Sequence, residues 1–142
     1  MKYLSQFDVL QIRTRLQAAA RQPFDVLNPE GLHAALAAPR QFVFGEEMRA
    51  GVIPKAAILF LRLIQNHPFY DGNKRIAVEA LHLFCRRNGV ALTATPAEAL
   101  FFARRIALGE AGEQDVESWI RANSRAKEGS STEGNPNRRW EK

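Results

Sequence analysis

The sequence lacks a second cysteine, a long apolar run and a clustered basic patch, and each absence excludes a class of protein. The chain has one cysteine, Cys85, so it cannot form an internal disulfide, which fits a reducing compartment. Its most apolar stretch, residues 53–64, is interrupted by Pro54, Lys55 and Arg62 and is too short and too charged to span a membrane. The first residues contain no apolar run of the signal-peptide kind. We therefore expect a cytoplasmic protein without a membrane segment.

The formal net charge of +5 raises the question of a nucleic-acid or acidic protein partner. The basic residues do not form a cluster interleaved with aromatic residues, and no nucleic-acid-binding motif is present in the sequence. Part of the excess lies in the last segment, residues 124–142. We therefore interpret the charge as arginines scattered over the surface and expect no direct nucleic-acid binding.

The length and composition are those of one folded domain: 142 residues, of which 46% are hydrophobic and 25% charged. The spacing of apolar residues and breakers predicts an all-α protein. Helices are expected over residues 5–20, 29–38, 52–66, 73–88, 97–108 and 113–123. Residues 41–45 have a β-rich composition but are too few for a sheet, which favours a loop or a small hairpin. We expect a folded domain over residues 1–123 and a disordered polar tail over residues 124–142.

The two most apolar helices meet at the most informative segment of the chain. This segment reads His67-Pro68-Phe69-Tyr70-Asp71-Gly72-Asn73-Lys74-Arg75. Pro68 disfavours a helical conformation at His67, so the first helix should end near Asn66. The imidazole of His67 can accept a proton from a hydroxyl near neutral pH. The carboxylate of Asp71 is a hard oxygen ligand that suits Mg²⁺ shared with phosphates.

The second half of the segment has the residue types of a phosphate site. Gly72 permits a turn with positive φ that points successive backbone amides at one anion. Asn73 then opens a helix, whose N-terminus offers free amides and a positive dipole end. Lys74 and Arg75 add two cations beside those amides, and both can bind phosphate oxygens.

Each residue also has a purely structural interpretation. A histidine beside proline is usually a surface or capping residue, Asp-Gly-Asn is a common turn before a helix, and Lys-Arg is usually a solvated pair. Glu79 could pair with Arg75 one turn away, and His82 on the same polar stripe is better explained as a half-exposed helix residue. The convergence of all these groups within His67–Arg75 favours a site that moves a phosphate-bearing group.

The pattern His-Pro-Phe-x-Asp-Gly-Asn-Lys-Arg resembles the signature of the Fic/Doc superfamily, and its Asn-Lys-Arg ending resembles the Doc (death-on-curing) branch. Residues 29–39 and 83–90 are similar to the early helix and to the end of the central helix of that branch. The resemblance covers roughly residues 24–123. It implies an all-helical Fic fold with the motif between two central helices.

The resemblance also implies roles for the motif residues. His67 would be the general base for a target hydroxyl, Asp71 would hold Mg²⁺, and Phe69 would be a buried anchor. The phosphates of ATP would be bound by four consecutive residues, Gly72, Asn73, Lys74 and Arg75. Residues 41–47 would correspond to the flap that aligns the target backbone next to the site.

Two departures from the broader Fic pattern bear on the chemistry. Most AMP-transferring members have glycine at the position of Lys74, and an arginine that binds the γ-phosphate at the position of Val78. In the Doc branch ATP is understood to bind reversed, so the product is a phosphorylated protein, with translation elongation factor Tu as the known target and a cognate antitoxin as partner. We therefore favour a toxin kinase over a protein AMP-transferase or nucleotidyltransferase, and both over a binding module without catalysis. The intact His67 argues against the last.

One pattern near the end of the chain resembles the inhibitory motif of self-inhibited Fic proteins. Ser124, Glu128 and Gly129 have the spacing Ser-x-x-x-Glu-Gly. In those proteins the glutamate pairs with the second motif arginine, which is Val78 here. We therefore favour a chance match over an inhibitory role.

Overall fold

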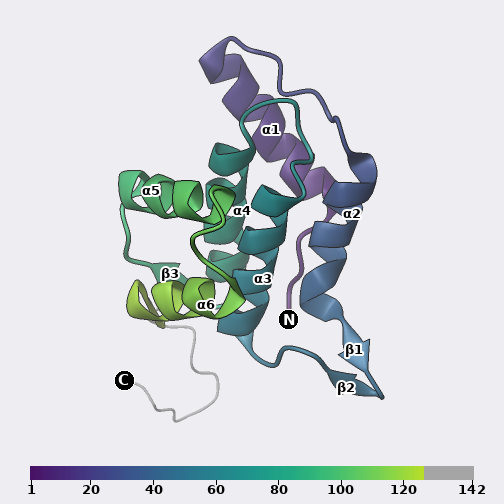
Figure 1. Ribbon diagram of the computed structural model, residues 1–142, viewed down its shortest axis with the longest axis vertical. Coiled ribbons are helices and arrows are strands. Elements are labelled where there is room, and N and C mark those ends of the chain that lie inside the picture. Colours follow the sequence, from purple (N-terminus) through teal and green to yellow (C-terminus); the bar gives the residue numbers. More distant parts are fainter. Residues whose placement is uncertain (127–142) are drawn as a thin grey trace.

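The computed structural model describes residues 1–126 and confirms an all-α protein with only short strands (Figure 1). In chain order the elements are α1 (Gln6–Ala20), α2 (Pro29–Ala37), the 3₁₀ helix η1 (Ala38–Arg40), β1 (Phe42–Val43), β2 (Glu46–Glu47), α3 (Val52–Gln65), α4 (Asn73–Arg87), β3 (Val90–Leu92), α5 (Pro96–Ala107), α6 (Glu113–Ala122) and β4 (Ser124–Ala126). Within these residues, none of the helices has both the length and the apolar character needed to cross a membrane.

Three of the helices begin at a capping side chain. Ser5 accepts a hydrogen bond from the backbone of Asp8 and caps α1. Asn28 accepts one from the backbone of Gly31 and caps α2. At α5, Thr95 forms the reciprocal pair of bonds that defines a capping box. Each cap satisfies an amide that the first turn of a helix leaves without an internal partner, which is why these boundaries could be read from sequence.

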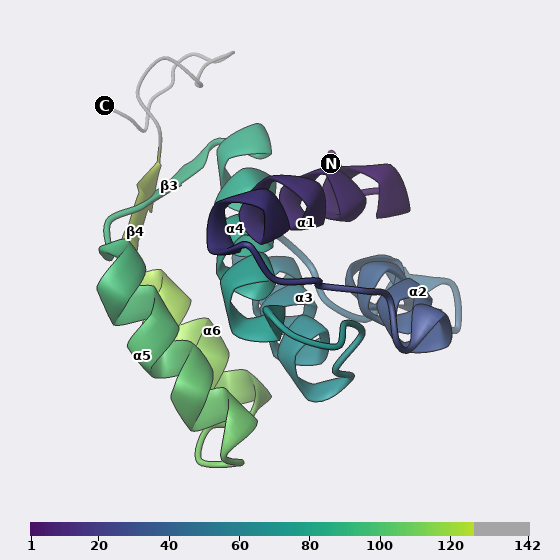
Figure 2. The ribbon, with the colours of Figure 1, turned by 90° about the horizontal axis from the view of Figure 1, so that it is seen from above.

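Helices α3 and α4 lie side by side in the middle of the molecule, with α1 and α2 on one side and α5 and α6 on the other (Figure 2). The largest of their fully buried apolar side chains are Phe60, Ile58, Leu59, Leu63, Ile76, Leu81 and Phe84. Helix α6 is held by Trp119, which stacks on Phe102 of α5 with ring centroids 4.7 Å apart. The two central helices are therefore fixed from both sides, and so is the loop that joins them.

The predicted hairpin forms, but it lies away from the motif. Strands β1 and β2 pair antiparallel at the beginning of α3, whereas the motif follows its end (Figure 1). Because α3 has 14 residues, about 21 Å separates its two ends. The expected flap next to the site is therefore wrong for residues 41–47. The buried ammonium of Lys55 instead anchors the base of the hairpin, donating to Glu47 Oε1 (2.6 Å) and to the carbonyl oxygens of Pro39 (3.0 Å) and Arg49 (2.7 Å).

A second pair of strands corrects the predicted domain boundary. Strand β4 pairs antiparallel with β3, so Ser124, Arg125 and Ala126 belong to the folded part rather than to the tail. The backbone amide of Thr93 extends this pairing by donating to the Asn123 carbonyl. The rest of the predicted tail lies outside the described residues, and with it Glu128 and Gly129 of the pattern that resembles an inhibitory motif.

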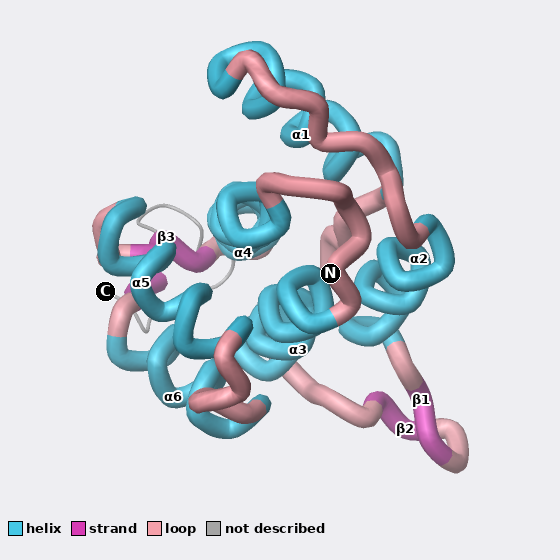
Figure 3. Tube along the Cα trace, turned by 45° about the horizontal axis from the view of Figure 1, so that its top comes forward, coloured by secondary structure: helices cyan, strands magenta, loops and turns pink. Residues whose placement is uncertain are grey.

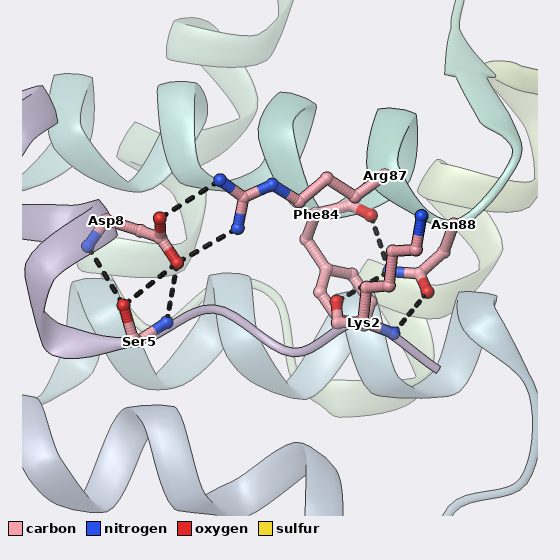
Figure 4. A network of polar contacts seen from close by, with 6 residues as sticks. All are labelled: Lys2, Ser5, Asp8, Phe84, Arg87 and Asn88. Carbon is pink, nitrogen blue, oxygen red and sulfur yellow. Dashed lines mark hydrogen bonds and ion pairs between the residues drawn. The ribbon is translucent and has the colours of Figure 1, made fainter.

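Polar contacts fix the N-terminal segment to the end of α4 (Figure 4). The two terminal guanidinium nitrogens of Arg87 donate to both carboxylate oxygens of Asp8, at 2.9 and 3.0 Å. The side chain of Asn88 accepts from the Lys2 amide (2.8 Å) and donates to the carbonyl oxygens of Lys2 and Phe84. Residues 79 and 86 positions apart in sequence are thereby joined.

Asp8→Asn is expected to remove an acid-sensitive part of the stability. Hydrogen bonding to Arg87 lowers the pKa of Asp8 from 3.8 to about 2. Because folding lowers this pKa, the carboxylate stabilises the folded state above about pH 4 and loses that contribution as the pH falls towards 2. Urea unfolding at pH 7 should show the variant less stable by about 1–2 kcal/mol. The difference should shrink by pH 2.5, and a difference independent of pH would contradict this assignment.

Candidate functional site

The motif loop connects α3 to α4 and lies against the segment that joins α1 to α2 (Figure 3). Pro68 accepts backbone hydrogen bonds from Leu27 (2.8 Å) and Asn28 (3.0 Å), and Tyr70 donates one to Asp25 (2.8 Å). His67 adopts a left-handed conformation with φ of +48°, which ends α3 as Pro68 predicts. The loop is thus held in place by backbone bonds to a distant segment.

Asn73 is the interior support of this loop. Its side-chain oxygen accepts from the Phe69 amide (2.9 Å), and its nitrogen donates to the Phe69 carbonyl (2.8 Å). Only 7% of Asn73 is exposed, and Phe69 is fully buried as expected of an anchor. The Asn73 side chain is therefore occupied within the protein, and only its backbone amide remains for the predicted phosphate contact.

The side-chain amide of Asn73 also contacts His67, the candidate general base. Asn73 Nδ2 lies 3.3 Å from Nδ1 of His67. Because the two bonds to Phe69 fix which end of the amide is the nitrogen, Asn73 can only donate to the ring. With Nδ1 as the acceptor in this contact, the ring proton lies on Nε2. For Nε2 to accept a proton, the ring proton must lie on Nδ1 instead, which ends the contact with Asn73. At 3.3 Å this contact is long for a hydrogen bond, so its loss costs little free energy. His67 is otherwise exposed to solvent.

Gly72 has both the conformation and the space that only glycine tolerates. Its φ is +78°, and a Cβ atom built on it would lie 2.5 Å from the Phe24 ring. It precedes the first turn of α4, which no side chain among residues 1–126 caps. The amides of Asn73, Lys74 and Arg75 therefore keep the anion-binding capacity of an uncapped helix N-terminus.

A pocket of about 590 Å³ brings all the predicted site residues together. It is lined by His67, Asp71, Gly72, Asn73, Lys74 and Arg75 of the motif. The rest of the lining comes from Ala19, Ala20, Gln22 and Phe24 near the end of α1, from Ile64 of α3, from Tyr70 within the motif, and from Leu100, Arg104 and Ala107 of α5. Sequence reasoning missed these residues of the lining, since their place depends on how α1 and α5 dock against the central helices.

The charge of the lining favours an anion. Lys74, Arg75 and Arg104 are cations, and Asp71 is the single carboxylate in the lining. Glu79, which was expected to pair with Arg75, lies 3.2 Å from Arg15 of α1 instead. Arg75 is left without an ion pair among residues 1–126, so its guanidinium remains available to a ligand.

The chemistry of the lining is compatible with a magnesium–nucleotide complex. The described residues contain no group of three or more acidic, histidine or cysteine side chains that could hold a metal by itself. Mg²⁺ is commonly bound by one or two carboxylates together with substrate phosphates and water. Asp71 fits that mode as the single carboxylate of the lining, with phosphate oxygens and waters as the other ligands.

His82 does not take part in this site. It is absent from the pocket lining, and burial lowers its pKa below the ordinary value. Both observations agree with a helix residue packed between neighbours rather than with a second base.

The helical fold and the motif loop define a class that comparison with known proteins supports. Residues 3–85, more than half of the chain, match the Fic/DOC family, so this chain belongs to that family. The chain is also 43% identical over 63 residues to the protein named Toxin Doc of Mycolicibacterium smegmatis (strain ATCC 700084 / mc(2)155). This match covers 44% of the chain and 48% of the relative, about half the length of each. The resemblance to the Doc branch is thereby confirmed.

Proposed function

We propose that this protein is a Doc-like toxin that transfers the γ-phosphate of ATP to a hydroxyl of translation elongation factor Tu and arrests translation in the cytoplasm. The observation that carries the proposal is the convergence of His67, Asp71 and three cations in one pocket at the N-terminus of α4. The name of the relative from M. smegmatis supports the toxin part. A toxin of this kind implies a cognate antitoxin that silences it.

The residues of the pocket have distinct roles in this reaction. The hydroxyl oxygen of the target attacks the γ-phosphorus while His67 accepts its proton, and the bond from that phosphorus to the β–γ bridging oxygen breaks to release ADP. The amides that follow Gly72 bind phosphate oxygens, together with Lys74 and Arg75. Asp71 would hold Mg²⁺, which neutralises phosphate charge when bound. Catalysis then depends on positioning and on electrostatic stabilisation.

Two features of α4 support phosphate transfer over nucleotide transfer. Lys74 lines the pocket at a position where AMP-transferring relatives usually have glycine. Val78, at the position of their second arginine, is only 4% exposed and belongs to the core. A triphosphate would therefore contact the cation Lys74 near the Gly72 turn, but no cation at Val78, one turn further along α4. This differs from the arrangement in AMP-transferring relatives, which present the α-phosphate to the target.

A paired transfer assay tests the proposal. Purified protein, elongation factor Tu and Mg²⁺ are incubated with ATP labelled at either the α- or the γ-phosphate. Label should move to the target from the γ position alone, and His67→Ala should reduce the rate by about 100-fold or more. Transfer of the α label would identify a nucleotidyltransferase, and full activity of His67→Ala would argue against general-base catalysis by this residue.

A further inference from the structure

Arg104 is the cation of the pocket that lies outside the motif. With Leu100 and Ala107 it forms one face of α5, since residues four and three positions apart share a face of a helix. Arg104 is exposed and has no ion pair within residues 1–126. The pocket is therefore bordered by a free guanidinium on a wall that the motif does not supply.

Arg105, the next residue of α5, contacts other protein groups and provides a comparison for Arg104. Arg105 lies 3.7 Å from the carboxylate of Glu110, and its guanidinium lies 5.7 Å from the centroid of the Phe102 ring. It faces protein groups and does not line the pocket. Arg104 has no such partner, although the two residues are adjacent and belong to the same last turn of α5.

Arg104 adds a cation on a side of the pocket where α4 provides none. Lys74 and Arg75 are the cations of α4 in the pocket, and the apolar Val78 faces the core. A phosphate chain held on α4 by the first turn alone would have contacts on one side. Arg104 adds a planar, bidentate donor from another helix, a geometry that suits phosphate oxygens.

We propose that Arg104 binds the phosphate chain of the nucleotide from α5 and, together with Lys74, determines how the triphosphate lies in the pocket. The inference rests on the proposed function, because it takes ATP as the ligand. It makes α5 part of the nucleotide site and gives the pocket a specificity-determining residue beyond the motif.

The test measures nucleotide binding by the full chain without any target protein. Isothermal titration of Mg²⁺–ATP and Mg²⁺–AMP is compared for the wild type, Arg104→Ala, Arg104→Lys and the matched control Arg105→Ala. Arg104→Ala should weaken ATP binding by about tenfold or more. It should affect AMP less, because AMP has fewer phosphates to contact. Arg104→Lys should recover part of the loss, and Arg105→Ala should bind ATP like the wild type.

The outcomes separate this inference from the proposed function. If the wild type binds ATP and Arg104→Ala binds it equally well, the inference is overturned while the proposed function stands. If the wild type binds no Mg²⁺–ATP, the proposed function itself fails. Melting temperatures of the variants show whether a loss of binding reflects unfolding; Arg104 is exposed, so its replacement should leave the melting temperature close to that of the wild type. A lowered melting temperature that accounts for the lost binding would also overturn the inference.

Discussion

Asn73→Ala is expected to destabilise the protein by about 2–4 kcal/mol and to reduce phosphate transfer by at least about 100-fold. The substitution removes both side-chain bonds to Phe69 and leaves a buried amide and a buried carbonyl without partners. It also removes the contact with the His67 ring. The motif loop would then lose the geometry that joins the imidazole to the first turn of α4. Urea unfolding measures the first effect, and the labelled-ATP assay measures the second.

Asn88→Ala is a matched control for this prediction. Asn88 also makes three side-chain hydrogen bonds, to Lys2 and Phe84, but at the opposite end of α4 (Figure 4). It should lower the stability while leaving the rate of transfer per folded molecule close to that of the wild type. If Asn73→Ala transferred phosphate at the wild-type rate, the loop would not need this internal support.

Gly72→Ala is expected to have a comparably large effect through a different mechanism. Alanine at φ of +78° carries a backbone cost of about 1–2 kcal/mol. The added Cβ would also overlap the Phe24 ring, which is 97% buried and has little room to move. Overpacking of this kind costs about 1–3 kcal/mol more. The loop can relieve the overlap only by shifting the amides that follow Gly72, so ATP binding should weaken as well.

Gly109→Ala separates the two costs. Gly109 has nearly the same φ, +79°, but a Cβ built there meets nothing within 4 Å. It should therefore show the backbone cost alone, with unchanged ATP binding by isothermal titration. Equal losses of stability in the two variants would mean that the Phe24 ring moves aside freely, and the close packing of Gly72 would then have no functional consequence.

The features that the sequence predicted are those that local chemistry decides. The starts of α1, α2 and α5 were predicted within a residue, and in the structure each is capped by a side chain that contacts a backbone amide three positions away. The motif is a continuous segment between two apolar helices, so its six predicted site residues had to lie near one another, and the structure places all of them around one pocket.

The features that the sequence did not predict depend on how distant segments dock. Strand β4 pairs with β3, more than 30 residues earlier, and the short segment Ser124–Ala126 gives no local sign of a strand. The hairpin was expected beside the motif, but the whole length of α3 lies between the two. Arg104 resembles any exposed helical arginine until α5 is placed beside α4. The role of the Asn73 side chain depends on its hydrogen bonds to the backbone of Phe69 in the same loop, and the sequence alone does not show such bonds.

The spread of the pocket lining along the sequence has a consequence for the newly made protein. The residues that line the pocket run from Ala19 to Ala107, and the N-terminal segment is hydrogen-bonded to Asn88. A ribosome adds about 5–20 residues per second, and domains fold as they emerge. The motif leaves the ribosome well before α5 does, so for a few seconds of each synthesis His67 and the turn at Gly72 exist without the residues that α5 adds to the pocket. A nascent chain of this protein therefore cannot form the complete pocket until nearly the whole folded part has been synthesised.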